Sequence, residues 1–163
     1  TYTGQWAEGR IEGQGRATLA DGVVVEGAFR AGLPHGMGRM VFPDGRVYEG
    51  GLAAGLREGQ GVMTYPDGTR YEGGFLGGER EGQGSITRAD GFSYVGEWRA
   101  GRIEGRGIAT YATGDVYDGD FVAGQRVGRG SLRYASGDVV SGRWDMGVLV
   151  EPDATPAGTG GDG

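Results

Sequence analysis

The sequence contains no cysteine and no lysine, and each absence excludes classes of protein chemistry. Without cysteine the chain has no disulfide, no thiolate zinc site, no iron–sulfur cluster and no cysteine nucleophile. All 16 basic residues are arginine, so the chain also lacks the lysine of a phosphate-binding P-loop, of a Schiff base or of a lysine general base. Most nucleotide hydrolases are thereby excluded.

Long apolar runs are absent as well. No apolar run approaches the roughly 18 residues that a membrane-spanning helix needs, and no charged segment followed by an apolar one opens the chain as in a secretory signal. The net charge of −6 disfavours nucleic acid and anionic membrane lipid as partners. The sequence fixes no compartment, but these features favour a soluble, cytoplasmic protein without a nucleic-acid partner.

Residues suited to catalysis or metal binding are few. The single histidine, His35, lies beside Pro34 and Gly36 in a predicted turn, with no second histidine and no serine elbow motif. The spacing of Asp115, Asp118 and Asp120, with Asp138 one unit on, fits neither an EF-hand loop nor the calcium-binding β-roll nonapeptide. We therefore predict that the chain is not an enzyme, and we expect no metal and no other cofactor.

Glycine, by contrast, is abundant and periodic. There are 39 glycines, and most recur every 23 residues, together with a tyrosine or valine and a larger apolar residue. This period makes the chain a repeat protein with units starting near residues 2, 25, 48, 71, 94, 117 and 140. The first position of each unit is occupied by Tyr2, Val25, Tyr48, Tyr71, Tyr94, Tyr117 and Val140.

Two strands are predicted in each unit. The pattern Tyr-x-Gly-x-Trp alternates with period two, as does the run Gly61-Val62-Met63-Thr64-Tyr65. In the first unit the strands are expected at residues 2–7 and roughly 15–20. An Asp-Gly pair follows in most units, as at residues 21–22, and predicts a two-residue turn with positive φ at both positions. The glycines between the strands predict a second, looser turn.

The fold class is therefore all-β: a single elongated, twisted antiparallel sheet of tandem 23-residue β-hairpin repeats. Seven units predict about 13 strands and a length of roughly 60 Å at about 4.8 Å per strand. Glycines leave room for a ring on one strand to lie flat across the next strand, which gives a single sheet its core. Residues 1–150 form the repeat domain, with a partial last unit, and residues 151–163 are expected to be a flexible Pro/Gly-rich tail.

One face of this sheet should carry an aromatic stripe. The main role expected of any single ring is core packing. A one-layer sheet leaves such a stripe uncovered, however, so part of it should also contact a partner. An amphipathic helix or a second copy of the chain would fit this groove. The predicted partner-binding groove consists of Tyr48, Tyr65, Tyr71, Phe75, Tyr94, Trp98, Tyr111, Tyr117 and Phe121.

The opposite face of the first strands is acidic. It carries Glu26, Glu49, Glu72, Glu97, Asp118 and Asp120. We interpret it mainly as a solvated face, with a docking stripe for a basic partner as the alternative. Because Arg16, Arg39 and Arg133 are expected on the same face of the second strands, partial cross-strand pairing of these charges is predicted.

The run Tyr71-Glu72-Gly73-Gly74-Phe75, followed by Gly78, Gly82, Gly84 and Asp90-Gly91 at a strict 23-residue period, resembles the MORN (membrane occupation and recognition nexus) repeat. The resemblance implies an elongated twisted sheet with an aromatic-lined groove that serves as a scaffold or protein-binding module. It also implies possible lipid binding and homodimerisation, often beside a separate catalytic domain. Val25, Val140 and Leu52 depart from the aromatic pattern and weaken the expected groove contacts in the second, third and seventh units.

The leading functional hypothesis is a non-catalytic scaffold that binds a partner segment along the groove. Self-association, through the groove or through a sheet edge, is a variant of the same chemistry. One alternative is attachment to lipid head groups at a membrane surface, which rests on the resemblance and is disfavoured by the net charge. Another is that the chain is the targeting segment of a larger enzyme.

Overall fold

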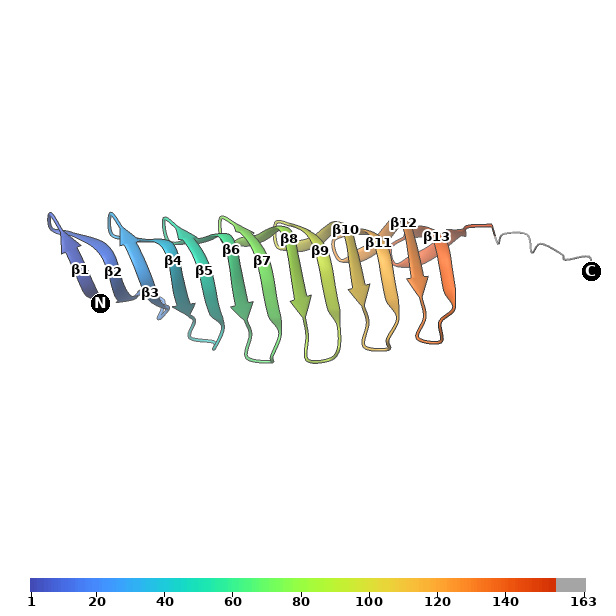
Figure 1. Ribbon diagram of the computed structural model, residues 1–163, viewed down its shortest axis with the longest axis horizontal. Helices are drawn as coiled ribbons and strands as arrows, with labels where there is room; N and C mark the ends of the chain where they lie inside the picture. Colours follow the sequence, from blue (N-terminus) through green and yellow to red (C-terminus); the bar gives the residue numbers. More distant parts are fainter. Residues whose placement is uncertain (155–163) are drawn as a thin grey trace, which may run out of the picture.

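The computed structural model describes residues 1–154, which form one antiparallel sheet of fourteen strands in sequence order (Figure 1). Every strand pairs with the strands before and after it along the chain, so the sheet grows by one hairpin per repeat. The strands are β1 (Tyr2–Ala7), β2 (Arg10–Thr18), β3 (Val24–Arg30), β4 (Leu33–Val41), β5 (Val47–Ala53), β6 (Leu56–Thr64), β7 (Arg70–Leu76), β8 (Glu79–Thr87), β9 (Ser93–Arg99), β10 (Arg102–Thr110), β11 (Val116–Val122), β12 (Gln125–Arg133), β13 (Val139–Asp145) and β14 (Val148–Pro152). The all-β repeat architecture predicted from the 23-residue period is confirmed.

A row of paired glycines runs across the sheet from β1 to β13. Gly61, for example, pairs with Gly50 on one side and with Gly73 on the other. The same pairing recurs because the period places a glycine at this position of each strand up to β13, whereas Pro152 of β14 lies opposite Gly142. The row comprises Gly4, Gly15, Gly27, Gly38, Gly50, Gly61, Gly73, Gly84, Gly96, Gly107, Gly119, Gly130 and Gly142.

The core of the sheet lies on this glycine row. A Cβ placed on Gly61 would come within 2.5 Å of the Tyr48 ring, so only glycine leaves room for that ring. The side chains of Tyr48, Tyr71, Tyr94 and Tyr117 are 0% exposed. The prediction that rings lie across the glycines of the next strand is therefore confirmed, and a single layer obtains a buried core in this way.

The two turns of each repeat are the reverse of those predicted. The two-residue turn joins the two strands of a unit, and the Asp-Gly pair lies in the longer turn. The two-residue turn with positive φ at both positions lies at Glu8 and Gly9, with φ values of 50° and 75°, and its equivalents recur in each unit. The Asp-Gly pair instead ends a four-residue turn. In the first unit this turn is closed by a hydrogen bond from Gly22 N–H to the Leu19 carbonyl of 3.0 Å. Asp21 keeps a negative φ, because its Oδ1 accepts the N–H of Val23 at 3.1 Å.

The tight turn also explains why the second strand starts earlier than predicted. Ala7 pairs with Arg10 directly across the turn, so β2 begins at residue 10 rather than near residue 15. The strand count is fourteen rather than about thirteen, and β14 extends to Pro152, just past the predicted boundary at residue 150. The predicted flexibility of the tail from residue 155 onward lies outside the described residues.

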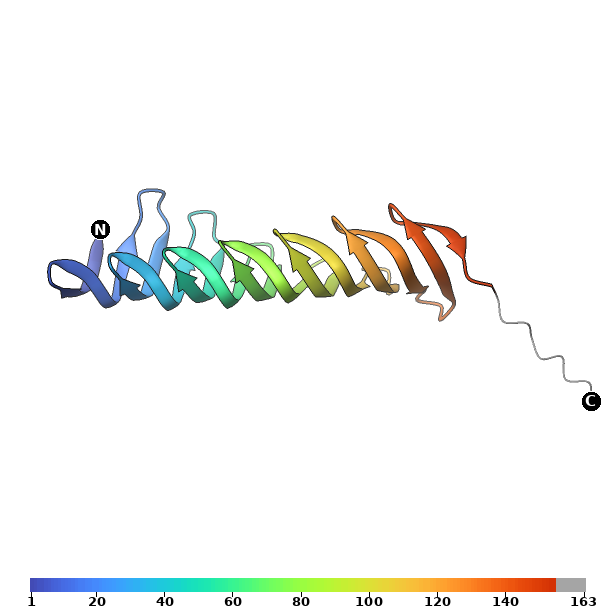
Figure 2. The same ribbon diagram turned by 90° about the horizontal axis from the view of Figure 1, so that it is seen from above.

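Each second strand bends sharply. Phe75 pairs with Arg80 and Gly73 with Gly84, so three residues of β8, 81–83, lie opposite the single residue Gly74 of β7, which is a bulge that kinks the strand. Arg57 and Tyr65 would lie about 26 Å apart along a straight strand, yet both line one pocket. The aromatic side is therefore the inner side of the bend, and Figure 2 shows the resulting curvature of the strands.

Candidate functional site

The inner face of the bent sheet, here called the aromatic face, carries a continuous ladder of rings. Eight rings meet edge to face, with centroids 5.0–5.5 Å apart and ring planes inclined by 81–87°. Such pairs add about 0.5–1.5 kcal/mol each beyond the burial of their area. The rings follow one another in the order Tyr48, Phe75, Tyr71, Trp98, Tyr94, Phe121, Tyr117 and Trp144.

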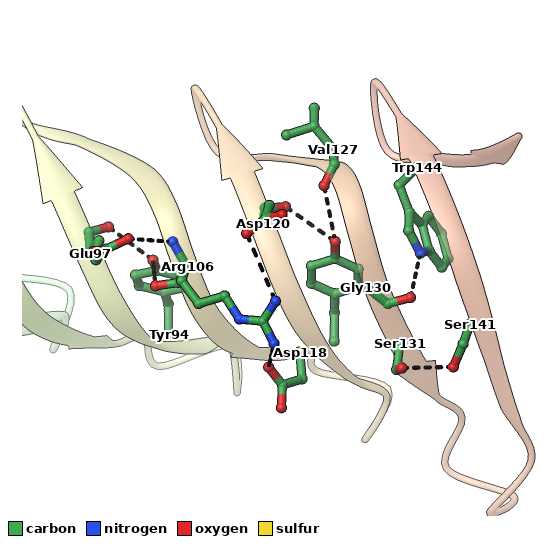
Figure 3. A network of polar contacts seen from close by, with 11 residues as sticks. Tyr94, Glu97, Arg106, Asp118, Asp120, Val127, Gly130, Ser131, Ser141 and Trp144 are labelled. Carbon is green, nitrogen blue, oxygen red and sulfur yellow. Dashed lines mark hydrogen bonds and ion pairs between the residues drawn. The ribbon is translucent and has the colours of Figure 1, made fainter. Parts of the chain in front are cut away.

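The ladder is anchored to the backbone by its polar atoms. Tyr71 Oη donates to the Gly74 carbonyl at 2.8 Å, and Tyr48, Tyr94 and Tyr117 repeat this bond to the carbonyl three residues on. Trp144 Nε1 donates to the Gly130 carbonyl at 3.0 Å (Figure 3). Burial raises the pKa of Tyr48, Tyr71 and Tyr94 to about 12. These phenols are therefore protonated donors at neutral pH.

The structure divides the nine predicted groove residues into two groups. Seven rings are at most 6% exposed, so their side chains form the core of the isolated chain. Tyr65 and Tyr111 are only half-buried, and they lie at the rim of the aromatic face. Partner contact at all nine positions stays a prediction, and the rings with free surface are those two. The seven buried rings are Tyr48, Tyr71, Phe75, Tyr94, Trp98, Tyr117 and Phe121.

The departures from the aromatic pattern mark the end of the ladder. Val25 and Leu52 are buried in place of rings, with exposures of 0% and 4%. Tyr2 forms a separate cluster with Trp6 and Phe29, at 5.4 and 5.1 Å. The continuous ladder therefore covers the third to the seventh unit.

Arginine side chains lie over the ladder. The Arg80 guanidinium is 4.7 Å from the centroid of a Trp98 ring, and Arg126 is 4.7 Å from Trp144. Arg57 lies 5.7 Å from the rings of both Phe42 and Phe75. These separations are within the range of cation–π attraction.

Two of these arginines also bridge to the next hairpin. Arg57 Nη2 donates to the Gly78 carbonyl at 2.7 Å, and Arg126 Nη2 donates to the Gly147 carbonyl at 2.8 Å. Each bond joins residues 21 apart, so the arginine fixes one turn against its neighbour. The guanidinium groups are thus held in place before any partner arrives.

A pocket of about 210 Å³ opens on the aromatic face between these groups. Its wall contains three arginines, Arg46, Arg57 and Arg80, with Tyr65 beside them and Glu79 as the one carboxylate. The like charge of Arg46 adds to burial in lowering the pKa of Arg57. A chain with a net charge of −6 therefore gathers positive charge here.

Sequence reasoning missed this arginine cluster, because the residues are scattered along the chain. A signal existed nonetheless, since Arg57, Arg80 and Arg126 each follow the tight-turn glycine by two residues. The period places them in one row on the aromatic face. Ile103 occupies the same position in the unit between Arg80 and Arg126.

The opposite face pairs its charges across strands, as predicted. Arg16 Nε lies 3.0 Å from Glu26 Oε1, and Arg39 Nε lies 3.2 Å from Glu49 Oε1. In Figure 3, Arg106 lies between Asp118 and Asp120, at 3.6 and 3.9 Å. These pairs are about half exposed, so each contributes little to stability. The predicted pairing of Arg133 is absent from the ion pairs of residues 1–154.

Two other features are absent from the described part of the chain. Residues 1–154 contain no group of three histidine, cysteine or acidic side chains arranged to hold a metal ion. Over the same residues, the structure has no helix with the length and hydropathy needed to cross a membrane. The aromatic face with its arginine row is therefore the candidate site.

Comparison with known proteins identifies the repeat. The family model of the MORN repeat matches residues 2–24, 26–45, 48–70, 71–93, 94–116 and 117–139. A comparison with curated proteins found no match.

The solved structures that the chain matches include two complexes. The TCP domain of Drosophila melanogaster SAS-4 (dCPAP), in complex with a proline-rich motif of Ana2 (dSTIL), is 15% identical with a TM-score of 0.49, and the alignment covers 85% of this chain and 81% of that one. The TCP10 domain of Danio rerio CPAP, in complex with a peptide of STIL, is 16% identical with a TM-score of 0.35, and the alignment covers 81% of this chain and 64% of that one.

Proposed function

The chain belongs to the MORN-repeat family, and on this premise we propose that its sheet is a non-catalytic scaffold that binds a segment of a partner protein along the aromatic face. One observation carries the proposal. Beyond the buried rings of the ladder, the rim of this face carries two half-buried tyrosines, Tyr65 and Tyr111, beside arginines that stack on rings. Tyrosine and arginine dominate the energetics of protein interfaces.

The aromatic face belongs to a single layer of strands. No second sheet or helix of residues 1–154 covers the aromatic face, because all fourteen strands belong to one sheet. The rim tyrosines therefore keep apolar surface in contact with water, which association with a partner would remove. The arginines are already positioned by the rings beneath them, so less side-chain freedom is lost on binding.

The experiment is capture of binding proteins with the purified chain as bait. The test variant carries Tyr65→Ala and Tyr111→Ala, which remove rim rings while leaving the buried ladder in place. The matched control carries Val95→Ala and Ile108→Ala, which remove the same number of apolar side chains from the opposite face, where they are 60% and 46% exposed. Both variants should keep the wild-type circular dichroism spectrum.

A protein that is captured by the wild type and by the control, and is lost with the rim variant, supports the proposal. Loss with the control variant instead would assign binding to the opposite face. Variants of Tyr71 and Phe75 would be a poor choice for this test, since both rings are buried and their removal would destabilise the sheet.

The other hypotheses from the sequence stay predictions with their own measurements. Self-association, through the aromatic face or a sheet edge, would appear as a rise in mass with concentration in analytical ultracentrifugation. Attachment to lipid head groups would appear as flotation with anionic liposomes at physiological salt. A role as the targeting segment of a larger enzyme would require a catalytic domain in the same polypeptide.

A further inference from the structure

The arginine row of the aromatic face, Arg57, Arg80 and Arg126, carries an inference about the partner, which rests on the function proposed above. All three side chains are half-buried. None forms an ion pair with a carboxylate of residues 1–154. A half-buried cation without a counter-ion is unusual, because burial of a charge costs free energy unless an opposite charge accompanies it.

Two of the acidic residues adjacent to the row bond to backbone N–H groups instead, while Glu79, next to Arg80, lines the same pocket without forming an ion pair within residues 1–154. Glu58 follows Arg57, but its Oε2 accepts the N–H of Gly77 at 2.9 Å. Glu81 follows Arg80, and its Oε2 accepts the N–H of Ala100 at 2.9 Å. These carboxylates tie each hairpin to the tight turn of the next one and leave the guanidinium groups unpaired.

Five arginines of the opposite face, in contrast, lie close to carboxylates, although Arg133 of that face forms no ion pair within residues 1–154. There Arg16, Arg39, Arg106, Arg129 and Arg143 all lie within 4 Å of a carboxylate. The contrast separates arginines that neutralise the sheet's own acid from arginines that stack on rings and have no carboxylate partner within residues 1–154. It also gives the aromatic face a positive charge that an acidic partner would complement.

We propose that the occupant of the aromatic face is an acidic amphipathic helix of a partner protein, with carboxylates that pair with Arg57, Arg80 and Arg126. The spacing of the row supports a helix. Adjacent repeats are two strands apart, or about 9.6 Å, and a helix rises about 10.5 Å in seven residues. Acidic residues at positions i, i+7 and i+21 would then meet the three arginines, with a drift of about 3 Å over the whole span that the long side chains can absorb.

The shape of the face agrees with the same occupant. Ile103 interrupts the arginine row, so position i+14 of the helix should be apolar. The rim tyrosines Tyr65 and Tyr111 run parallel to the row, and a helix about 10 Å across covers both. An acidic stripe beside an apolar stripe is the pattern of an amphipathic helix.

The test uses a synthetic helical peptide of 24 residues, fluorescently labelled, with Glu at positions 2, 9 and 23, Leu at position 16 and further Leu on the adjacent stripe. Its binding to the full chain is measured by fluorescence anisotropy at low and at high salt. Two control peptides have the same length and also carry three Glu. One moves the three Glu to the opposite helical face, and one is a proline-rich sequence with its three Glu separated by three and six residues.

Two protein variants and one peptide variant complete the design. Arg80→Glu should weaken binding of the helical peptide at least tenfold, because it puts like charges face to face. A peptide with Arg at position 9 should restore most of that loss. Arg133→Glu, which changes an exposed arginine of the opposite face, should leave the affinity within twofold of the wild type. High salt should weaken the wild-type complex.

The proposal is wrong if the helical peptide does not bind, if it binds Arg80→Glu as well as the wild type, or if the proline-rich peptide binds better. These results can be separated from failure of the proposed function. If Tyr65→Ala with Tyr111→Ala still abolishes capture of a cellular protein while the acidic helix fails, the aromatic face is a binding site for a different segment. If neither effect is seen, both proposals fail.

Discussion

Arg39 and Arg80 have different partners on the two faces of the sheet. On the opposite face, Arg39 and Glu49 neutralise each other across neighbouring strands, largely in solvent. On the aromatic face, Arg80 stacks on Trp98 and has no acidic partner in the described chain. The exposed ion pairs of the first face contribute little to stability. The second face carries the buried rings of the core, with arginines that stack on them.

The largest loss of stability is expected on raising the pH, because ionisation affects several buried tyrosines of the aromatic face together. Burial raises the pKa of Tyr48, Tyr71 and Tyr94 from 10.0 to about 12. Since the folded value exceeds the unfolded one, the stabilisation is fully present below about pH 10 and is lost as the pH rises towards 12. We expect circular dichroism and tyrosinate absorbance to change together in this range. Full tyrosinate absorbance with an intact sheet at pH 11 would contradict the burial argument.

Removal of one ring should give the next largest effect. Tyr71→Ala is expected to lower the free energy of unfolding by about 3–5 kcal/mol, because a fully buried ring leaves a cavity. The control is the adjacent residue on the other face, Glu72→Ala, which breaks an exposed ion pair with Arg70 and should cost less than about 1 kcal/mol. Urea denaturation measures both. Equal losses would mean that the two faces contribute alike to stability.

A methyl group added at Gly84, in the glycine row, or at Gly82, outside it, distinguishes the cost of lacking space from the cost of backbone strain. A Cβ at Gly84 would lie 2.7 Å from Cζ and Cε2 of Tyr71, so Gly84→Ala should cost about 2–3 kcal/mol through overpacking. A Cβ at Gly82 would meet no atom within 4 Å, but φ there is 74°, so Gly82→Ala should cost only about 1 kcal/mol. Thermal unfolding of the two variants would order them. A greater loss for Gly82→Ala would reverse the assignment.

Replacement of a single arginine should change the free energy of unfolding least, and by different amounts on the two faces. Arg80→Met keeps the apolar stem and removes the charge over Trp98, which should cost about 0.5–1 kcal/mol. Arg39→Met removes an exposed ion pair with Glu49 and should cost at most about 0.5 kcal/mol. Urea midpoints and tryptophan fluorescence provide the measurement. Identical midpoints would show that the stacked arginine contributes nothing to folding and is available wholly for binding.

Most of the fold could be predicted because the 23-residue period repeats the same local rules. The alternation in Tyr71-Glu72-Gly73-Gly74-Phe75 predicts the strand, and the glycine of the next strand predicts where the tyrosine ring lies. The turns were assigned the wrong way round. Asp-Gly suggests a two-residue turn, but the Asp21 carboxylate accepts an N–H two residues on and favours a longer turn, while Ala31 and Gly32 form the tight one.

The candidate site was less predictable, because it depends on how far the strands bend. Tyr65 and Tyr71 looked alike in the sequence as members of one aromatic stripe. Tyr71 lies across the glycine row and is fully buried, whereas Tyr65 lies at the rim. The arginines looked scattered, and the same bend brings Arg57 next to Arg46 and Tyr65 in one pocket.

The sequence by itself determined the repeat, the hairpins, the glycine row and the rings that lie on it, since each of these follows from residues close in the chain or one period apart. Only the tertiary structure decided which rings stay reachable and which arginines stay unpaired. These properties depend on the bulge that folds each second strand inward, and thus on contacts between strand ends that a linear pattern does not contain.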